Sequence, residues 1–179
     1  MNTQMSFDDD LLILVDESGQ EIGSKEKLQC HMGSGVLHRA FSVFIINSES
    51  EVLLQKRSED KLLWPMYWSN SCCSHPRYGE EEYDAARRRL LEELGIRATE
   101  LTKHFQFQYI ANYGDIGTEH ELCSVFTGHT EDEISANPNE IADWKWVAKS
   151  ELSELLIAEK EHFTPWINLA WKELKKVIC

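Results

Sequence analysis

Apolar runs separated by polar or glycine-containing segments predict the strands of this chain. Residues 11–15 form a short apolar run that closes on Asp16-Glu17-Ser18-Gly19, the pattern of a buried strand that enters a turn. A polar stretch, residues 21–28, follows. Residues 39–46 and 52–57 are rich in apolar side chains and are joined by a short polar segment, so they are predicted to be neighbouring antiparallel strands.

A helical period replaces the strand pattern at residues 81–94. Ala86, Leu90 and Leu94 recur every four residues and so share one stripe, and Gly95 suits the C-terminal stop. Three further stretches are predicted to form strands: a short strand through Trp68 after the Trp64-Pro65 break, a hairpin of residues 105–109 and 121–126, and a strand at 144–147. Two helices are predicted after them. The first runs from a Ser150 cap to about residue 159, and the terminal one starts at Thr164-Pro165 and carries Ile167, Trp171, Leu174 and Ile178.

The order of these elements indicates the fold class. Several strands precede the first long helix, more strands follow it, and two helices end the chain, which leaves too few strand–helix alternations for a doubly wound parallel sheet. We therefore expect a mixed α+β sandwich. A length of 179 residues with 42% hydrophobic content suits one domain spanning residues 1–179, with residues 1–8 as a flexible N-terminal tail.

Charge and cysteine usage narrow the function classes. With 18 basic and 31 acidic residues, the net charge of −13 argues against a surface for nucleic acid or anionic membranes, so any bound anion must be caught locally. The five cysteines are odd in number, and neither a secretory leader nor an apolar run of transmembrane length is visible. We expect reduced thiols and a cytoplasmic location, with monomer and homodimer both open.

The segment Asn70-Ser71-Cys72-Cys73-Ser74-His75-Pro76 brings a thiol and an imidazole next to the charged helix. Within that helix, Arg88 precedes Glu92, and Arg89 precedes Glu93, by four residues, so a solvated face with ion pairs is the simplest reading. The neighbouring thiol and imidazole favour another reading, in which carboxylate and guanidinium groups hold a Mg²⁺-diphosphate complex.

A second group of residues has the side chains of a metal site. It comprises His31, His38, His75, Glu119 and Glu121. A single histidine is more often a surface or core residue, but Glu119 and Glu121 stand two apart in a predicted strand and so point to one face. Three imidazoles with one or two carboxylates suit Zn²⁺, Mn²⁺ or Mg²⁺, and the mixed nitrogen and oxygen set leaves the choice open.

The stretch from residue 74 to 96 resembles a degenerate Nudix box, a strand–loop–helix that binds divalent metal and diphosphate. Two positions depart from the pattern, because Ser74 replaces the opening glycine and Arg89 replaces the glutamate after the box arginine. Exchanging a carboxylate for a guanidinium removes a metal ligand and attracts an anion instead, so ordinary Nudix hydrolysis is not expected. The matching positions are Arg88, Leu90, Glu92, Glu93, Gly95 and Ile96.

Together with the spacing of the histidines and the Glu119-His120-Glu121 triplet, the 70–76 segment resembles the type 1 isopentenyl-diphosphate isomerase family over most of the chain. The resemblance implies a Nudix-like mixed β-sheet sandwich flanked by helices. It also implies roles for individual residues. Cys73 and Glu121 would be the acid–base pair, with Tyr109 as a catalytic partner and Trp166 as an aromatic residue of the pocket.

The same resemblance implies two sites for divalent metal. Glu93 would hold Mg²⁺ on the substrate's diphosphate, and the ligands of the other metal would be His31, His38, His75, Glu119 and Glu121. The residues that would bind the diphosphate are Lys27, Arg57, Lys61 and Arg89.

The implied reaction converts isopentenyl diphosphate into dimethylallyl diphosphate, a small-molecule isoprenoid substrate, through a tertiary carbocation. The family pattern leaves open which of Cys73 and Glu121 gives the proton and which takes it. Two alternatives remain. A divergent Nudix hydrolase would cleave a diphosphate and release phosphate, and a metal-stabilised binding module would unfold on chelation and turn nothing over.

Overall fold

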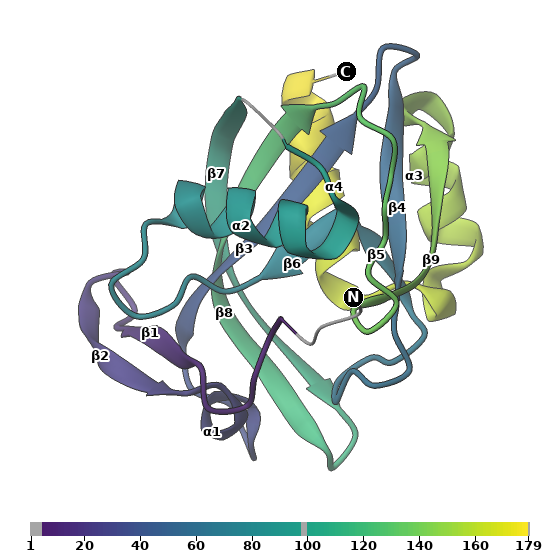
Figure 1. Ribbon diagram of the computed structural model, residues 1–179. Coiled ribbons are helices and arrows are strands. Elements are labelled where there is room, and N and C mark those ends of the chain that lie inside the picture. The colour runs from purple at the N-terminus through teal and green to yellow at the C-terminus, as the bar shows by residue number, and fades with distance from the viewer. Residues whose placement is uncertain (1–4, 98–99, 179) are drawn as a thin grey trace.

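Strands from the whole length of the chain join in one mixed sheet (Figure 1). The computed structural model describes residues 5–97 and 100–178, and within them the sheet has nine strands. In chain order the elements are β1 (Leu11–Val15), β2 (Glu21–Glu26), α1 (Lys27–His31), β3 (His38–Ile46), β4 (Glu51–Arg57), β5 (Trp68–Asn70), β6 (Cys72–Ser74), α2 (Glu82–Leu94), β7 (Leu101–Tyr113), β8 (Gly117–His129), β9 (Ile141–Ala148), α3 (Lys149–Ala158), the 3-10 turn η1 (Lys160–His162) and α4 (Pro165–Ile178).

Strand β3 lies at the centre of the sheet and pairs with β1, β4, β6 and β8. It runs parallel to β8 along its whole length, from His38 opposite Glu121 to Ile46 opposite His129, and antiparallel to β6. The predicted antiparallel pairing of β3 with β4 is confirmed only at Ile46 and Val52, next to the turn. Beyond that point β4 pairs with β5 and β9 instead, because β6 and β8 occupy the two sides of β3.

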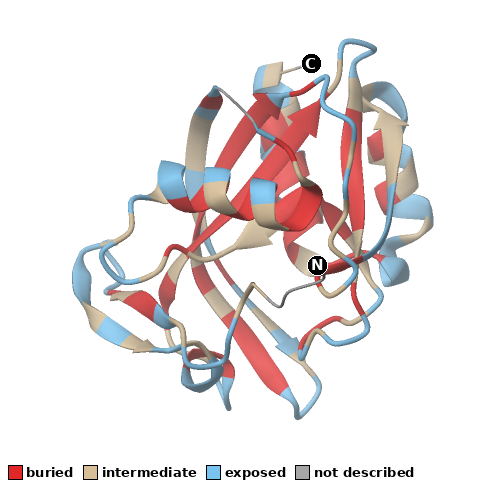
Figure 2. Cartoon of the chain, viewed as in Figure 1, coloured by how far each residue is buried: buried red, intermediate tan, exposed pale blue. Residues whose placement is uncertain are grey.

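The sheet is covered by helices on both faces, and the alternation of side chains along β3 explains why. Phe41, Val43 and Ile45 pack with the apolar stripe of α2, whereas Phe44 and Ile46 pack with α3 and α4. Both sets are almost fully buried, and the central strands form the buried interior in Figure 2. A strand with helices on both sides needs apolar residues at successive positions, which is the run seen in the sequence. The predicted α+β sandwich flanked by helices is confirmed.

Helix α2 follows the predicted pattern closely. Ala86, Leu90 and Leu94 are fully buried in the core on one face of the sheet. Gly95 ends the helix with φ 70°, and its N–H donates to the carbonyls of Leu90 and Leu91. A residue with a side chain would be strained in this left-handed conformation, so glycine defines the end of the helix.

Three local features differ from the predictions. Residues 21–26 form strand β2, which pairs with β1 alone and exposes most of its side chains, so it has no apolar alternation in the sequence. Residues 27–31 form the short helix α1. The predicted cap at Ser150 is wrong, because β9 continues to Ala148, α3 begins at Lys149, and the helix start has no side-chain cap. The predicted hairpin is confirmed. Its two strands, β7 and β8, are longer than the sequence predicted.

The predicted N-terminal tail, residues 1–8, lies partly outside the described residues. Residues 5–8 contact the rest of the fold: Lys27 Nζ donates to Ser6 Oγ at 2.6 Å, and the Leu28 N–H donates to the Asp8 carbonyl at 3.0 Å. These contacts place residues 5–8 against α1. Among the described residues, every helix is too short or too polar to cross a membrane.

Candidate active site

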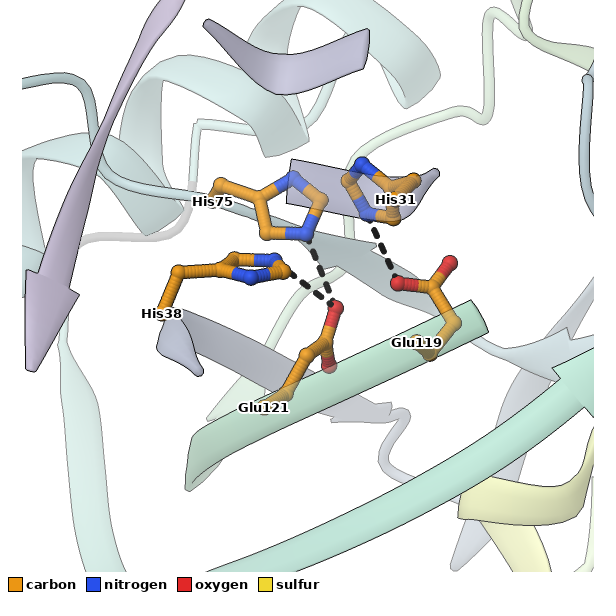
Figure 3. Close-up of side chains that lie close together, drawn as sticks. All are labelled: His31, His38, His75, Glu119 and Glu121. Carbon is orange, nitrogen blue, oxygen red and sulfur yellow. Dashed lines mark hydrogen bonds and ion pairs between the residues drawn. The ribbon is translucent and has the colours of Figure 1, made fainter. Parts of the chain in front are cut away.

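The five predicted metal ligands converge at one end of the sheet (Figure 3). One ligand atom from each lies within 4.8 Å of those from all the others. His31 ends α1, His38 begins β3, and His75 follows β6, while Glu119 and Glu121 come from β8. The register places His38 opposite Glu121, and the two-residue spacing turns both carboxylates to the same face. The structure thus brings together the five side chains that the sequence analysis grouped, and their role as metal ligands stays a prediction.

Backbone carbonyls orient two of the imidazoles. His31 Nδ1 lies 2.7 Å from the Lys27 carbonyl, and His38 Nδ1 lies 2.7 Å from the Val36 carbonyl. A carbonyl only accepts, so Nδ1 carries the proton and the Nε2 lone pair is available to a metal. His38 Nε2 is buried and has no hydrogen-bond partner among the described residues, and the Glu121 Oε1 atom lies 3.8 Å away from it.

The cluster fits one divalent cation. Ligand atoms about 2.0–2.2 Å from a shared ion can be at most about 4.4 Å apart, so a spread of 4.8 Å needs a contraction of only a few tenths of an ångström. A buried polar atom without a partner costs free energy, and a bound cation would remove that cost for His38 Nε2. Imidazole nitrogens and carboxylate oxygens together suit Zn²⁺ or Mn²⁺ as well as Mg²⁺.

Burial and the contacts between carboxylates and imidazoles set the protonation of the cluster. Burial lowers the pKa of His38 to about 4 and that of His75 well below its usual value, so these two rings are neutral at pH 7, as metal binding requires. Burial, followed by repulsion from Glu119, raises the pKa of Glu121. Burial opposes the charged forms of both His31 and Glu119, but their contact at 2.8 Å raises the pKa of His31 and holds the pKa of Glu119 low. The two carboxylates therefore act as a coupled pair.

A cavity of about 610 Å³ opens beside the cluster. Its wall contains the predicted acid–base pair, two aromatic residues and four basic side chains. Four of the five predicted metal ligands also line it, and Glu121 belongs to both groups. The predicted residues that line it are Lys27, His31, Arg57, Lys61, Cys73, His75, Arg89, Tyr109, Glu119, Glu121 and Trp166. Of the predicted site residues, His38 and Glu93 lie behind this wall.

Glu121 joins the metal cluster to the cavity. Its Oε1 atom lies 2.8 Å from His75 Nε2, and its Oε2 atom accepts a 2.6 Å hydrogen bond from the Tyr109 hydroxyl. Burial, and then the Glu121 charge, raises the pKa of Tyr109, so the phenol keeps its proton. Burial likewise raises the pKa of Cys73 to about 11, so this residue is a thiol at neutral pH.

Four basic residues form the cationic corner of the cavity: Lys27, Arg57, Lys61 and Arg89. Burial, reinforced by Lys61 and Arg89, lowers the pKa of Lys27 to about 8. Arg57 is fixed by the Leu63 carbonyl, 2.8 Å from its Nη2 atom, and its guanidinium lies 5.4 Å from the centre of the Trp166 ring. The corner thus concentrates positive charge within an acidic protein, as a local anion site requires.

Glu140 belongs to this corner and was missed in the sequence. Its Oε2 atom accepts from Arg89 Nη2 at 2.9 Å and forms an ion pair with Lys61. Although burial opposes ionisation, Lys61 and then Arg89 lower the pKa of Glu140 to about 2. No local pattern marks this residue, because its role depends on the preceding loop, whose Ser135 and Asn137 N–H groups donate to the Leu94 and Glu93 carbonyls at the C-terminal end of α2.

Glu93 lies on the core side of Arg89. Its Oε1 atom is 2.7 Å from Arg89 Nη2, and the side chain is only 3% exposed. Cys72 Sγ lies 3.5 Å from the same oxygen. The role of Glu93 toward Mg²⁺ therefore stays a prediction, and it requires Arg89 to share this carboxylate with the ion.

Comparisons with known proteins agree with this geometry. Residues 36–167 match the NUDIX domain family. The chain is 44% identical over 164 residues to Isopentenyl-diphosphate Delta-isomerase 1 of Photorhabdus laumondii, covering 91% of this chain and 93% of that protein. It is 43% identical over 159 residues to Isopentenyl-diphosphate Delta-isomerase 2 of Aromatoleum aromaticum, covering 89% and 83%.

Solved structures support the fold. A crystal structure of a Deinococcus radiodurans protein aligns with a TM-score of 0.73 and 20% identity, covering 91% of this chain and 98% of that one. A MutT protein from Methanosarcina mazei aligns with a TM-score of 0.63 and 17% identity, covering 78% and 94%. With a NUDIX match over residues 36–167 and these relatives across most of its length, the chain belongs to the isopentenyl-diphosphate Delta-isomerase family of NUDIX-domain proteins.

Proposed function

We propose that this protein interconverts isopentenyl diphosphate and dimethylallyl diphosphate. The observation that carries the proposal is one cavity lined by a thiol at Cys73, a carboxylate at Glu121 and a corner of four basic side chains. The names of the related isomerases support the same substrate and reaction. A small molecule with an anionic end and an apolar end matches a cavity built in this way.

The reaction moves one double bond and balances two protons. A proton is added to the terminal alkene carbon, and another is removed from the carbon on the far side of the branch point. An alkene is a very weak base, so the acid must be held in near-attack geometry and water must be kept from the tertiary carbocation. We assign the two proton transfers to Cys73 and to Glu121 with its partner Tyr109.

Aromatic rings suit the apolar part of the cavity. The Trp166 ring lies 6.2 Å from Tyr109 and 5.2 Å from Trp64, measured between ring centres. The negative face of an indole attracts cationic charge, yet the ring is a poor nucleophile and does not trap the cation. Trp166 therefore stabilises the carbocation in this proposal, and the surrounding rings exclude water.

His31, His38, His75, Glu119 and Glu121 would hold a divalent metal, with Mn²⁺, Zn²⁺ and Mg²⁺ as candidates. When bound, the metal would supply positive charge that lowers the proton affinity of the shared carboxylate. In this scheme three neutral imidazoles and one carboxylate fix the orientation of Glu121 toward the cavity.

In this proposal, binding of the diphosphate orients the substrate in the cavity. Lys27, Arg57, Lys61 and Arg89 would neutralise it, and we retain Glu93 as the residue that holds Mg²⁺ on the diphosphate. Binding energy from this remote end can then position the alkene between the acid and the base.

We further propose that residues 1–179 act as one domain in the cytoplasm, on this small molecule rather than on nucleic acid or membrane.

The test is incubation with isopentenyl diphosphate and Mg²⁺ in heavy water, followed by NMR. Deuterium uptake with formation of dimethylallyl diphosphate is expected. Cys73→Ala and Glu121→Gln should each abolish it, whereas Cys123→Ala, which removes a buried thiol outside the cavity, should leave it. Wild-type rates in either active-site variant would refute the assignment. Phosphate release would support a hydrolase, and an inert protein that unfolds on chelation would support a binding module.

A further inference from the structure

A cluster of three buried polar side chains lies next to Cys73. Ser69, Asn70 and Thr164 have no solvent exposure, and none of them lines the cavity. Burying a polar group costs free energy unless it is hydrogen-bonded, so such a cluster needs partners within the protein. Its partners include the Cys73 thiol and the indole N–H of Trp166.

Asn70 offers a fixed acceptor to the thiol. Its Nδ2 group donates to the carbonyls of Val43 and Cys72, each at 3.0 Å. Because carbonyls cannot donate, the amide has one orientation, and its Oδ1 atom must face the other way. That oxygen lies 3.2 Å from Cys73 Sγ and accepts the S–H hydrogen.

Ser69 and Trp166 both contact the same sulfur through groups that can donate a hydrogen bond. Trp166 Nε1 lies 3.1 Å from Cys73 Sγ and 3.0 Å from Ser69 Oγ. Ser69 Oγ lies 3.1 Å from the sulfur, 2.9 Å from Thr164 Oγ1 and 3.2 Å from Asn70 Oδ1. An indole can only donate, whereas a hydroxyl group rotates and can point its single hydrogen at any one of these three neighbours.

We propose that Ser69 is a positioning residue for Cys73, with a hydroxyl group that turns from a side-chain oxygen to the sulfur when the sulfur loses its proton, and back when the sulfur regains it. With the thiol present, S–H points to Asn70 Oδ1 and the Ser69 hydroxyl donates to Thr164. Whenever the sulfur is without its proton, the Ser69 hydroxyl and the Trp166 N–H both donate to it. Ser69 keeps its own proton throughout.

This arrangement replaces water around the sulfur. The reacting side of Cys73 must stay dry, so charge that develops on the sulfur has to be stabilised from behind by groups already in place. Removing one donor from such a preorganised set typically costs about 10²–10³ in kcat. Because Trp166 remains as a second donor, we expect about 10- to 100-fold for Ser69.

The inference rests on the proposed isomerase function, and the first experiment measures that reaction. Ser69→Ala should lower kcat by about 10- to 100-fold and leave KM within about twofold, since the hydroxyl lies away from the diphosphate corner. Ser71→Ala is the matched control. Its hydroxyl is equally buried, donates to the Leu53 carbonyl and accepts from the Ile45 N–H, both at 2.7 Å, so its loss should lower stability but leave kcat unchanged.

A second measurement needs no substrate. The S–H stretching band of Cys73, isolated as the infrared difference between wild type and Cys73→Ala, reports the hydrogen bonds of this thiol. Ser69→Ala should shift the band, because the Trp166 N–H loses Ser69 Oγ as an acceptor and then donates to the sulfur alone, whereas Ser71→Ala should not shift it. An unshifted band with unchanged kcat would overturn the proposal. A shifted band in a protein that does not isomerise the substrate would keep Ser69 as a thiol-positioning residue and reject the isomerase function.

Discussion

Replacing Glu140 by glutamine tests whether this carboxylate holds the cationic corner together. The substitution keeps the shape of the side chain and removes its charge. In the native protein the carboxylate is 3% exposed and contacts both Arg89 and Lys61. Without it, Arg89 still has Glu92 and Glu93 as partners, whereas Lys61, which is 21% exposed, must turn toward water.

The pKa of Glu140 gives the size and sign of the effect. The pKa falls from 4.5 to about 2 on folding, and each unit is worth about 1.4 kcal/mol, so the charged form contributes about 3 kcal/mol at pH 7. A lowered folded-state pKa stabilises the protein above the unfolded value of 4.5, and this contribution is lost as the pH falls through about 2. At pH 3 only about 1 kcal/mol remains.

The assay is urea denaturation of wild type and Glu140→Gln at pH 7, 4 and 3. The variant should be less stable by about 2–3 kcal/mol at pH 7, and the difference should shrink as the pH falls. Glu173→Gln is the control, because its ion pair with Lys176 lies on the surface and should contribute almost nothing. A deficit that is the same at pH 7 and pH 3, or no deficit at pH 7, would show that the charge of Glu140 is not what stabilises the corner.

Two further substitutions test the site and the core. In Gly117→Ala the new Cβ would lie 2.6 Å from the His31 carbonyl oxygen, so α1 must shift; calorimetric titration with Mn²⁺ should show about 10- to 100-fold weaker binding. The control Gly114→Asn has open space at a φ of 57° that asparagine tolerates, and equal Mn²⁺ affinity in both variants would contradict this reasoning. Leu90→Ala should lower the free energy of unfolding by about 2–5 kcal/mol in urea, whereas Leu91→Ala, at a position that is 49% exposed, should cost far less; similar costs would argue against the assigned helix face.

The elements that sequence reasoning found are those whose signals are local. Helix α2 was predictable because its apolar residues recur every four positions and Gly95 ends it in a conformation that suits glycine. Strand β2 was missed because only pairing with β1 makes it a strand, and its side chains are mostly exposed. The supposed cap at Ser150 failed because a polar residue near a helix start does not define the start when the preceding strand runs directly into the helix.

The candidate site divides in the same way. Its ligands could be named from residue type and family resemblance, but their meeting depends on β3 and β8 running side by side, which no short window of sequence contains. Glu140 and Ser69 had no motif at all. Each matters through one or two contacts across the fold, so it became visible only once Arg89 and Cys73 had positions.

The parallel pairing of β3 with β8 also bears on the order in which this protein folds. His38 and Glu121 face each other across that pairing although they are distant in the chain, so the metal ligands cannot assemble before a long loop has closed. Non-local pairing of this kind is slow, whereas α2 can form early from local contacts. A cation that binds only the assembled cluster would then bind after the strands have paired. It would slow unfolding but would not speed up folding. Refolding rates should therefore be nearly independent of metal concentration, and unfolding rates should fall as it rises.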